Sequence, residues 1–136
     1  MAQPDHPMHE EALQAVETLI RAGDQVFIVA QNVAEFWNVA TRPLANNGLG
    51  FSVQEAHEEV KRFSTILPLL PETDRIYPEW LRLVVLYAVS GVKVYDARLV
   101  AAMSVHGVTR ILTFNAEDFT RYASFEVFRP TDIHTE

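Results

Sequence analysis

The stretch VKVYDARLVAAM, residues 92–103, places one aspartate, Asp96, between a β-branched segment and a run of small and apolar residues. The run predicts a buried helix that begins at Asp96. The inner face of this helix carries Leu99, Val100 and Met103. A carboxylate beside a core is costly unless something binds it. Asp96 is therefore expected to have either a backbone partner, as a helix N-cap, or a ligand.

The composition predicts one folded domain over residues 1–136. Of the 136 residues, 49% are hydrophobic and 21% are charged, which suffices for a single core. The chain has no cysteine, so disulfides and thiolate zinc sites are excluded. No apolar run approaches the roughly 20 residues of a membrane span, and the first residues do not resemble a signal peptide. We therefore expect a cytoplasmic protein without a membrane segment.

The charge balance narrows the ways in which this chain can bind nucleic acid. Eleven Lys and Arg against eighteen Asp and Glu give a formal charge of −7. This charge argues against a protein that coats nucleic acid by bulk electrostatics. A phosphate substrate would need either a divalent cation or the arginines gathered on one face, since Lys61 and Lys93 are the chain's lysines.

Helical and strand-like patterns alternate along the chain. Apolar residues at helical spacing, together with capping and breaking residues, predict helices over about 9–22, 32–42, 53–66, 78–91 and 96–106. Short β-branched or apolar runs predict strands over 25–30, 109–114 and 125–128. Strands that alternate with helices in this way predict an α/β fold of three layers, α/β/α, with a mainly parallel central sheet.

Three acids, Glu35, Asp96 and Asp118, each lie in the first helical turn after an extended segment. Each has an ordinary explanation as part of a helix cap. Asn32 and Asn115 precede Glu35 and Asp118 at the capping spacing, and Asp96 itself is a possible N-cap residue. Taken singly, each acid is more often a cap than a ligand.

The joint placement of the three acids favours a metal site. The carboxyl ends of parallel strands lie along one edge of a sheet, so acids that follow different strands converge there. These motifs contain no lysine that would separate the three charges, and like charges repel one another. Mg²⁺ would relieve the repulsion, and its preference for carboxylate and phosphate oxygens points to phosphoryl chemistry.

Four strings, in this order, make the chain similar to bacterial PIN-domain proteins of the VapC-type toxin group: EFWNVATRP, NGLG, DARLVAAM and LTFNAEDF. The resemblance covers about residues 8–130. It implies a single-strand-specific ribonuclease that depends on Mg²⁺ or Mn²⁺, is usually a homodimer, and is often inhibited by a small cognate antitoxin. Carried over by position, Glu35 and Asp96 match two acids of the family's metal site.

The third acid of the resemblance falls in the segment LTFNAEDF. Many relatives have an aspartate where this chain has Asn115, so Asp118 is expected to supply the charge instead. Asn115 is expected to orient a water or the scissile phosphate. The resemblance also implies a first central strand that ends in an aspartate, and the sequence shows no counterpart of it. We expect a missing segment, through a late start or a truncation, in preference to a degenerate toxin.

Two principal hypotheses follow. In the first, the chain is a metal-dependent endoribonuclease in which Glu35, Asp96 and Asp118 hold the ion and Asn115 acts on the water or phosphate. In the second, it is a catalytically silent or truncated PIN fold that binds an antitoxin or RNA. A third reading, a phosphate- or nucleotide-binding α/β domain, lacks the P-loop and the G-x-G-x-x-G pattern that such domains use.

Overall fold

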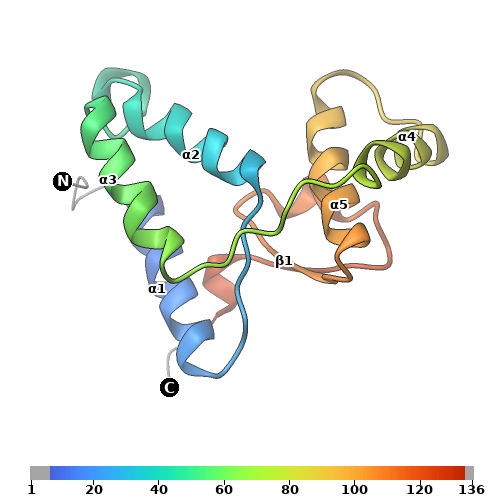
Figure 1. Ribbon diagram of the computed structural model, residues 1–136, viewed down its shortest axis with the longest axis horizontal. Helices are drawn as coiled ribbons and strands as arrows, with labels where there is room; N and C mark the ends of the chain where they lie inside the picture. Colours follow the sequence, from blue (N-terminus) through green and yellow to red (C-terminus); the bar gives the residue numbers. More distant parts are fainter. Residues whose placement is uncertain (1–6, 134–136) are drawn as a thin grey trace. The chain divides into compact units, whose positions relative to one another are not determined.

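The computed structural model describes residues 7–133. The chain divides into two compact units, Met1–Pro71 (unit 1) and Glu72–Glu136 (unit 2), and each is described by itself (Figure 1). Unit 1 contains helices α1 (Pro7–Arg21), α2 (Ala30–Thr41) and α3 (Val53–Ser64) and a short 3-10 helix, η1 (Leu44–Asn46). Unit 2 contains α4 (Ile76–Leu86), η2 (Gly91–Lys93), α5 (Val94–Val105), β1 (Arg110–Leu112), η3 (Ala116–Phe119), β2 (Glu126–Phe128) and η4 (Pro130–Asp132).

Helix α1 ends and helix α3 begins next to the residues that the sequence predicts for these positions. Beyond α1, the chain turns at Gly23, whose φ is 93°, and the amides of Gly23 and Asp24 donate to the carbonyls of Ile20 and Leu19, each at 3.0 Å. This is a Schellman arrangement, in which glycine tolerates the left-handed conformation. The predicted end of the first helix is confirmed.

The start of α3 is a complete capping box. The Ser52 hydroxyl accepts a hydrogen bond from the Glu55 amide at 3.0 Å, and the Glu55 carboxylate accepts one from the Ser52 amide at 2.9 Å. Two amide groups that the helix leaves unpaired are thereby satisfied. The predicted start of this helix is confirmed, and Glu55 takes part in its cap.

The core of unit 1 lies between α2, α3 and the segment that joins them. Its buried members are Ala40, Leu49, Phe51 and Ala56, against which Phe36, Trp37 and Val39 pack. The apolar face predicted for the second helix is thus confirmed. The joining segment passes so close to the end of α2 that a Cβ at Gly48 would lie 2.1 Å from the Arg42 carbonyl oxygen. Only glycine fits there without a shift of the backbone.

The predicted strand over 25–30 is wrong in extent. The described residues of this segment make one isolated parallel bridge, between Ile28 and Leu69, in which the Ile28 amide donates to the Pro68 carbonyl at 3.0 Å. The strand is cut short because Val29 is already the N-cap residue of α2. Asn32, predicted as the N-cap, lies one turn further in, and its side chain accepts a hydrogen bond from the Val29 amide at 2.9 Å.

Helices α4 and α5 pack together in unit 2. Leu83 of α4 is buried, and the Trp80 indole donates to the Val94 carbonyl, at the start of α5, at 2.8 Å. The buried side of α5 is formed by small and apolar residues: Ala97, Val100, Ala101, Ala102 and Met103. The fourth helix ends at Leu86, earlier than predicted, because the chain turns at Ala88, whose φ is 51°.

Strands β1 and β2 form a parallel pair, with Arg110, Ile111 and Leu112 opposite Glu126, Val127 and Phe128. The fold class is therefore α/β, as predicted, and predominantly helical with a small parallel sheet. Among the described residues the sheet has two strands, fewer than a central sheet requires. The three-layer arrangement and the single domain over residues 1–136 concern both units together and stay predictions.

Candidate acidic site

Asp96 lies in the first turn of α5, but it is not the N-cap residue. The N-cap position belongs to Lys93, whose backbone is itself helical, with φ −66° and ψ −12°, and no side chain caps this helix end. The predicted start of the helix at Asp96 is wrong because η2 (Gly91–Lys93) runs directly into α5. The N-cap explanation for Asp96 is thereby removed, and its half-buried side chain is an acid of the first helical turn.

An ion pair joins the start of α5 to η3. The Lys93 ammonium donates a hydrogen bond to the Asp118 carboxylate, 25 positions along the chain. The side chains of Lys93 and Asp118 are 45% and 27% exposed, so solvent screens the pair only in part. The expectation that no lysine relieves the charge of these acids is therefore wrong. A contact over this separation leaves no local signal in the sequence.

Asp96 acts on the same ammonium group. The hydrogen bond to Asp118 raises the pKa of Lys93 most, burial opposes this, and the charges of Asp118 and Asp96 raise the pKa further. Asp96 also contributes to the pKa of Tyr122, which burial raises in the first place. The Tyr122 ring packs edge-on against Tyr87, with 4.9 Å between ring centres. We call Asp96 and Asp118 the acid pair of unit 2.

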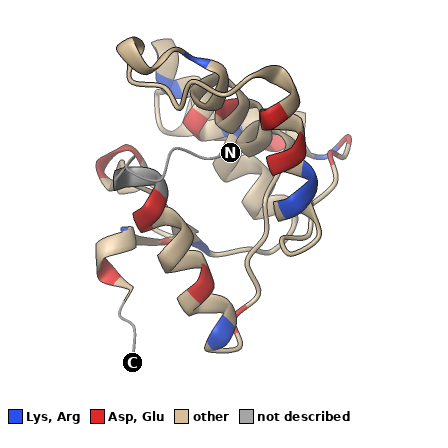
Figure 2. Ribbon diagram, turned by 90° about the vertical axis from the view of Figure 1, so that its left-hand side faces the viewer, with Lys and Arg blue, Asp and Glu red and all other residues tan. Residues whose placement is uncertain are grey.

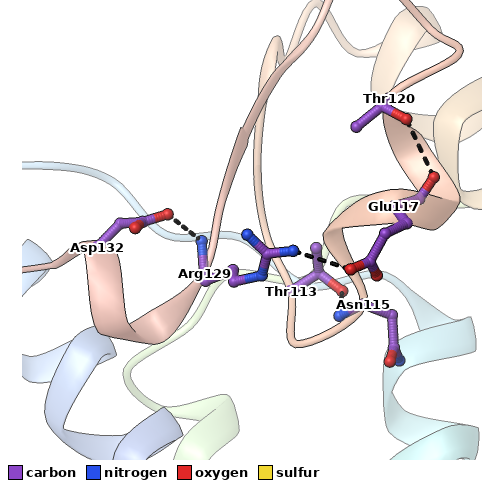
Figure 3. Close-up of polar contacts among 6 residues, drawn as sticks. All are labelled: Thr113, Asn115, Glu117, Thr120, Arg129 and Asp132. Atoms are coloured by element: carbon purple, nitrogen blue, oxygen red, sulfur yellow. Dashed lines mark hydrogen bonds and ion pairs between the residues drawn. The ribbon is translucent and has the colours of Figure 1, made fainter.

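Asn115 precedes η3 and is exposed, and its side chain does not cap that turn. The backbone amide of Asn115 donates to the Thr113 hydroxyl at 3.1 Å, and its backbone carbonyl accepts a hydrogen bond from the Asp118 amide at 3.1 Å. The predicted capping role of Asn115 is wrong. Figure 3 shows its amide side chain directed away from the neighbouring ion pair of Glu117 and Arg129, which is 3.0 Å long.

Glu35 lies in unit 1, on α2, and its side chain is exposed. Gln31 donates a hydrogen bond to it at 3.4 Å, near the limit of such contacts. Since Asn32 reaches back to Val29, the predicted cap that would include Glu35 is absent. The structure pairs Asp118 with Lys93, three positions before Asp96, and links Asn115 to Asp118 through the backbone. These residues lie in unit 2, whereas Glu35 lies in unit 1.

The donor chemistry of the acid pair suits a hard divalent cation, because carboxylate oxygens are the ligands that Mg²⁺ and Mn²⁺ take. Over residues 7–133, no group of three or more His, Cys, Asp or Glu side chains lies close enough together to hold a metal ion. Unit 2 thus supplies two acids of the proposed set, and Lys93 occupies one oxygen of Asp118. The ammonium lies where a cation would bind that oxygen.

A separate pocket of about 350 Å³ lies beside α4 and the end of α5, and it contains none of the four predicted residues. Its lining residues are Arg75, Pro78, Glu79, Arg82, Ser104 and Val105. Glu79 accepts two hydrogen bonds from Arg82, at 2.9 and 2.8 Å, and one from the Ser104 hydroxyl at 3.0 Å. The bonds from Arg82 are the main cause that lowers the pKa of Glu79.

Sequence reasoning missed this pocket. The i, i+3 spacing of Glu79 and Arg82 on α4 is a signal for the ion pair. The partner from α5, Ser104, lies 25 positions away from Glu79 and leaves no such signal.

The basic residues do not gather on one element. Figure 2 shows Lys and Arg positions on separate helices and turns, with Asp and Glu on the same elements. Within the part of the chain that the structure describes, glutamates pair with the guanidinium groups of Arg62, Arg82, Arg98 and Arg129. These arginines are committed to carboxylates, so the alternative of a shared arginine face for phosphate gains no support from them.

Comparison with known proteins bears on the family. A profile of the PIN domain matches residues 3–124, which span both units. No curated protein and no solved structure matches the chain. No helix described between residues 7 and 133 has the length and apolar character that crossing a membrane requires. PIN domains are generally nucleases of RNA or DNA and typically use divalent metal ions. By this match over most of its length, the chain belongs to the PIN-domain family.

Proposed function

We propose that this PIN-domain protein is an endoribonuclease that hydrolyses RNA phosphodiesters with Mg²⁺ or Mn²⁺. Glu35, Asp96 and Asp118 would hold the ion, and Asn115 would orient the attacking water or the scissile phosphate. The observation that carries the proposal is the ion pair between Lys93 and Asp118, because it joins η3 to the start of the helix that bears Asp96. The family match supports the nuclease class.

The loss of the capping explanations adds support. Glu35 and Asp96 do not cap their helices, and Asp118 directs its carboxylate to Lys93. Asp96 and Asp118 remain first-turn acids, which favour a helix N-terminus through its dipole, but neither is an N-cap residue. When bound, a divalent ion would polarise the phosphodiester and lower the pKa of a bound water. The acids would contribute charge and oxygen ligands, and Asn115 a neutral hydrogen-bonding group.

We further propose, from the resemblance to VapC-type toxins, that the chain works in the cytoplasm as the toxin of a toxin–antitoxin pair. Its partners would be single-stranded RNA, a cognate antitoxin and a second copy of the chain in a homodimer. The rival proposal is a catalytically silent module that binds an antitoxin or RNA. The ion pair between Lys93 and Asp118 favours this rival, because it neutralises one acid of the set without a metal.

Cleavage of a fluorescent single-stranded RNA by the purified chain tests the proposal. With Mg²⁺ or Mn²⁺ we expect cleavage that EDTA stops and that Asp96→Asn lowers by at least about 100-fold, on the scale seen when metal-site interactions are removed. Glu55→Gln is the matched control, since Glu55 is a first-turn acid that caps α3. It should lose stability and keep its activity.

The other hypotheses predict different outcomes of this experiment. If Asp96 has a purely structural role as a first-turn acid, Asp96→Asn costs about 0.5 kcal/mol of stability and leaves cleavage intact. If the chain is a silent module, the wild type binds the RNA, as measured by fluorescence anisotropy, without cutting it. Cleavage that survives both EDTA and Asp96→Asn would eliminate the metal mechanism.

A further inference from the structure

Lys93 is the group in unit 2 on which both acids of the proposed metal site act. Its ammonium donates a hydrogen bond to Asp118, and the charge of Asp96, three positions further on, also acts on it. Lys93 directly precedes α5, so the helix that carries Asp96 also fixes where the lysine stem begins. The ammonium therefore balances part of the negative charge of the acid pair.

A divalent ion at Asp118 and the ammonium of Lys93 oppose one another. Both use oxygens of the same carboxylate, and two cations held at this distance repel, the more so because the two side chains are partly shielded from water. The lysine stem is long and flexible, so the ammonium can leave Asp118 while the backbone of α5 stays in place. A metal that binds must first displace it.

We propose that Lys93 is a built-in counter-cation that holds Asp96 and Asp118 in place when no metal is bound and competes with Mg²⁺ or Mn²⁺ for Asp118. This inference rests on the proposed function, since it assumes that the acid pair belongs to a metal site. Lys93 is then a positioning residue. The affinity of the site for metal is set by the difference between the free energy gained on binding the ion and the free energy lost when the ammonium leaves Asp118.

Titration of Mn²⁺ into the whole chain, followed by calorimetry, tests the proposal. Lys93→Met removes the competing charge, so Mn²⁺ should bind about tenfold more tightly than in the wild type. Lys93→Arg keeps the charge and should bind Mn²⁺ about as the wild type does. The matched control is Lys61→Met, because Lys61, the other lysine of the chain, forms an exposed 3.3 Å pair with Glu58. It should leave Mn²⁺ affinity unchanged.

Thermal unfolding gives a second readout that does not depend on activity. Without metal, Lys93→Met should melt below the wild type, because the acid pair has lost its counter-charge. With saturating Mn²⁺ its melting temperature should rise by more than that of the wild type, since the tighter ligand stabilises more. Adding Asp118→Asn to Lys93→Met should cancel the gain. If Lys93→Met does not fold, Lys93→Gln, which keeps a polar group without the charge, takes its place.

The inference is overturned if the uncharged variants bind Mn²⁺ no more tightly than the wild type, or if Lys61→Met shows the same gain. Parallel cleavage assays separate this failure from that of the nuclease. Tighter Mn²⁺ binding without cleavage by any variant keeps the counter-cation and removes the nuclease. Metal-dependent cleavage with unchanged Mn²⁺ affinity keeps the nuclease and removes the counter-cation.

Discussion

Each of the two units contains side-chain contacts within itself, and the range of these contacts along the chain differs between the units. In unit 1, the hydrogen bonds at the starts of α2 and α3 join residues three positions apart, as between Ser52 and Glu55. In unit 2, the ion pairs of Lys93 with Asp118 and of Arg98 with Glu72 span 25 and 26 positions. Local contacts fix where a helix begins, whereas the long-range contacts join segments that lie far apart in the sequence.

This difference separates two kinds of acid. Glu55 and Asp96 both lie in the first turn of a helix. The carboxylate of Glu55 closes a capping box with its own helix end, and that of Asp96 acts on a lysine that is bonded to another element. The position of an acid in a helix therefore does not reveal its role. The partner of the acid reveals it.

The largest effect is expected from Gly48→Ala in unit 1. The added Cβ would lie 2.1 Å from the Arg42 carbonyl oxygen, a backbone atom that cannot move aside, so we expect a loss of about 2–3 kcal/mol in urea unfolding. Hydrogen exchange should quicken first in α2 and α3. A loss of amide protection as large in α5 would contradict the local character of unit 1.

Gly23→Ala is the graded control for this variant. A Cβ at Gly23 meets no atom within 4 Å, so only the positive φ of 93° is strained. The expected loss is about 1 kcal/mol, which isolates the steric part of the effect at Gly48.

An intermediate effect is expected from a pair of serine variants, one in each unit. Ser52→Ala removes the cap of α3 and should cost about 1 kcal/mol, with faster exchange of the first α3 amides. Ser104→Ala removes an exposed hydrogen bond to Glu79 across 25 positions and should cost about 0.5 kcal/mol. If Ser104→Ala disturbs only the end of α5, the long-range contact does not link it to α4.

The smallest effect is a pH dependence in unit 2. The hydrogen bonds from Arg82 lower the pKa of Glu79 below its ordinary value of 4.5. The unfolded chain then binds this proton more readily, so the stabilisation is complete above about pH 4.5 and is lost as the pH falls through the folded pKa. We expect it to amount to at most about 1 kcal/mol.

Urea unfolding at several pH values between about 3 and 6 measures this contribution of Glu79 to the free energy of unfolding. Glu79→Gln should flatten the loss of stability on the acid side. Glu58→Gln, in an exposed pair with Lys61, controls for the loss of a charge alone. An unchanged acid limb in Glu79→Gln would show that the contact between α4 and α5 does not depend on this carboxylate.

Much of the fold was predictable because its signals are short. The capping box at Ser52, the apolar face of α2 and the glycine beyond α1 each depend on residues within one or two turns. The strand over 25–30 was overestimated for a similarly local reason. Asn32 serves as the third residue of α2 and not as its N-cap, so the helix begins three residues earlier than the asparagine suggests.

The candidate site was predictable only in its residue types. The sequence indicated that acids from separate segments would meet, and this stays a prediction, although Asp118 does pair with the residue that precedes the helix of Asp96. It did not indicate that this residue, Lys93, would be the partner, because a contact across 25 positions depends on how η2, α5 and η3 pack. The place of Glu35 relative to this pair stays a prediction.

The two tryptophans of the chain fall one in each unit. Trp37 packs against the core beside α2, and Trp80 donates its indole hydrogen to the Val94 carbonyl at the entry of α5. The molecule thus carries two tryptophan fluorophores, which can be excited apart from its tyrosines, in different surroundings. With Trp37→Phe the remaining emission reports on the neighbourhood of the acid pair, and with Trp80→Phe it reports on the other core. Whether the two halves melt in one step or two can therefore be read from emission spectra without any attached dye.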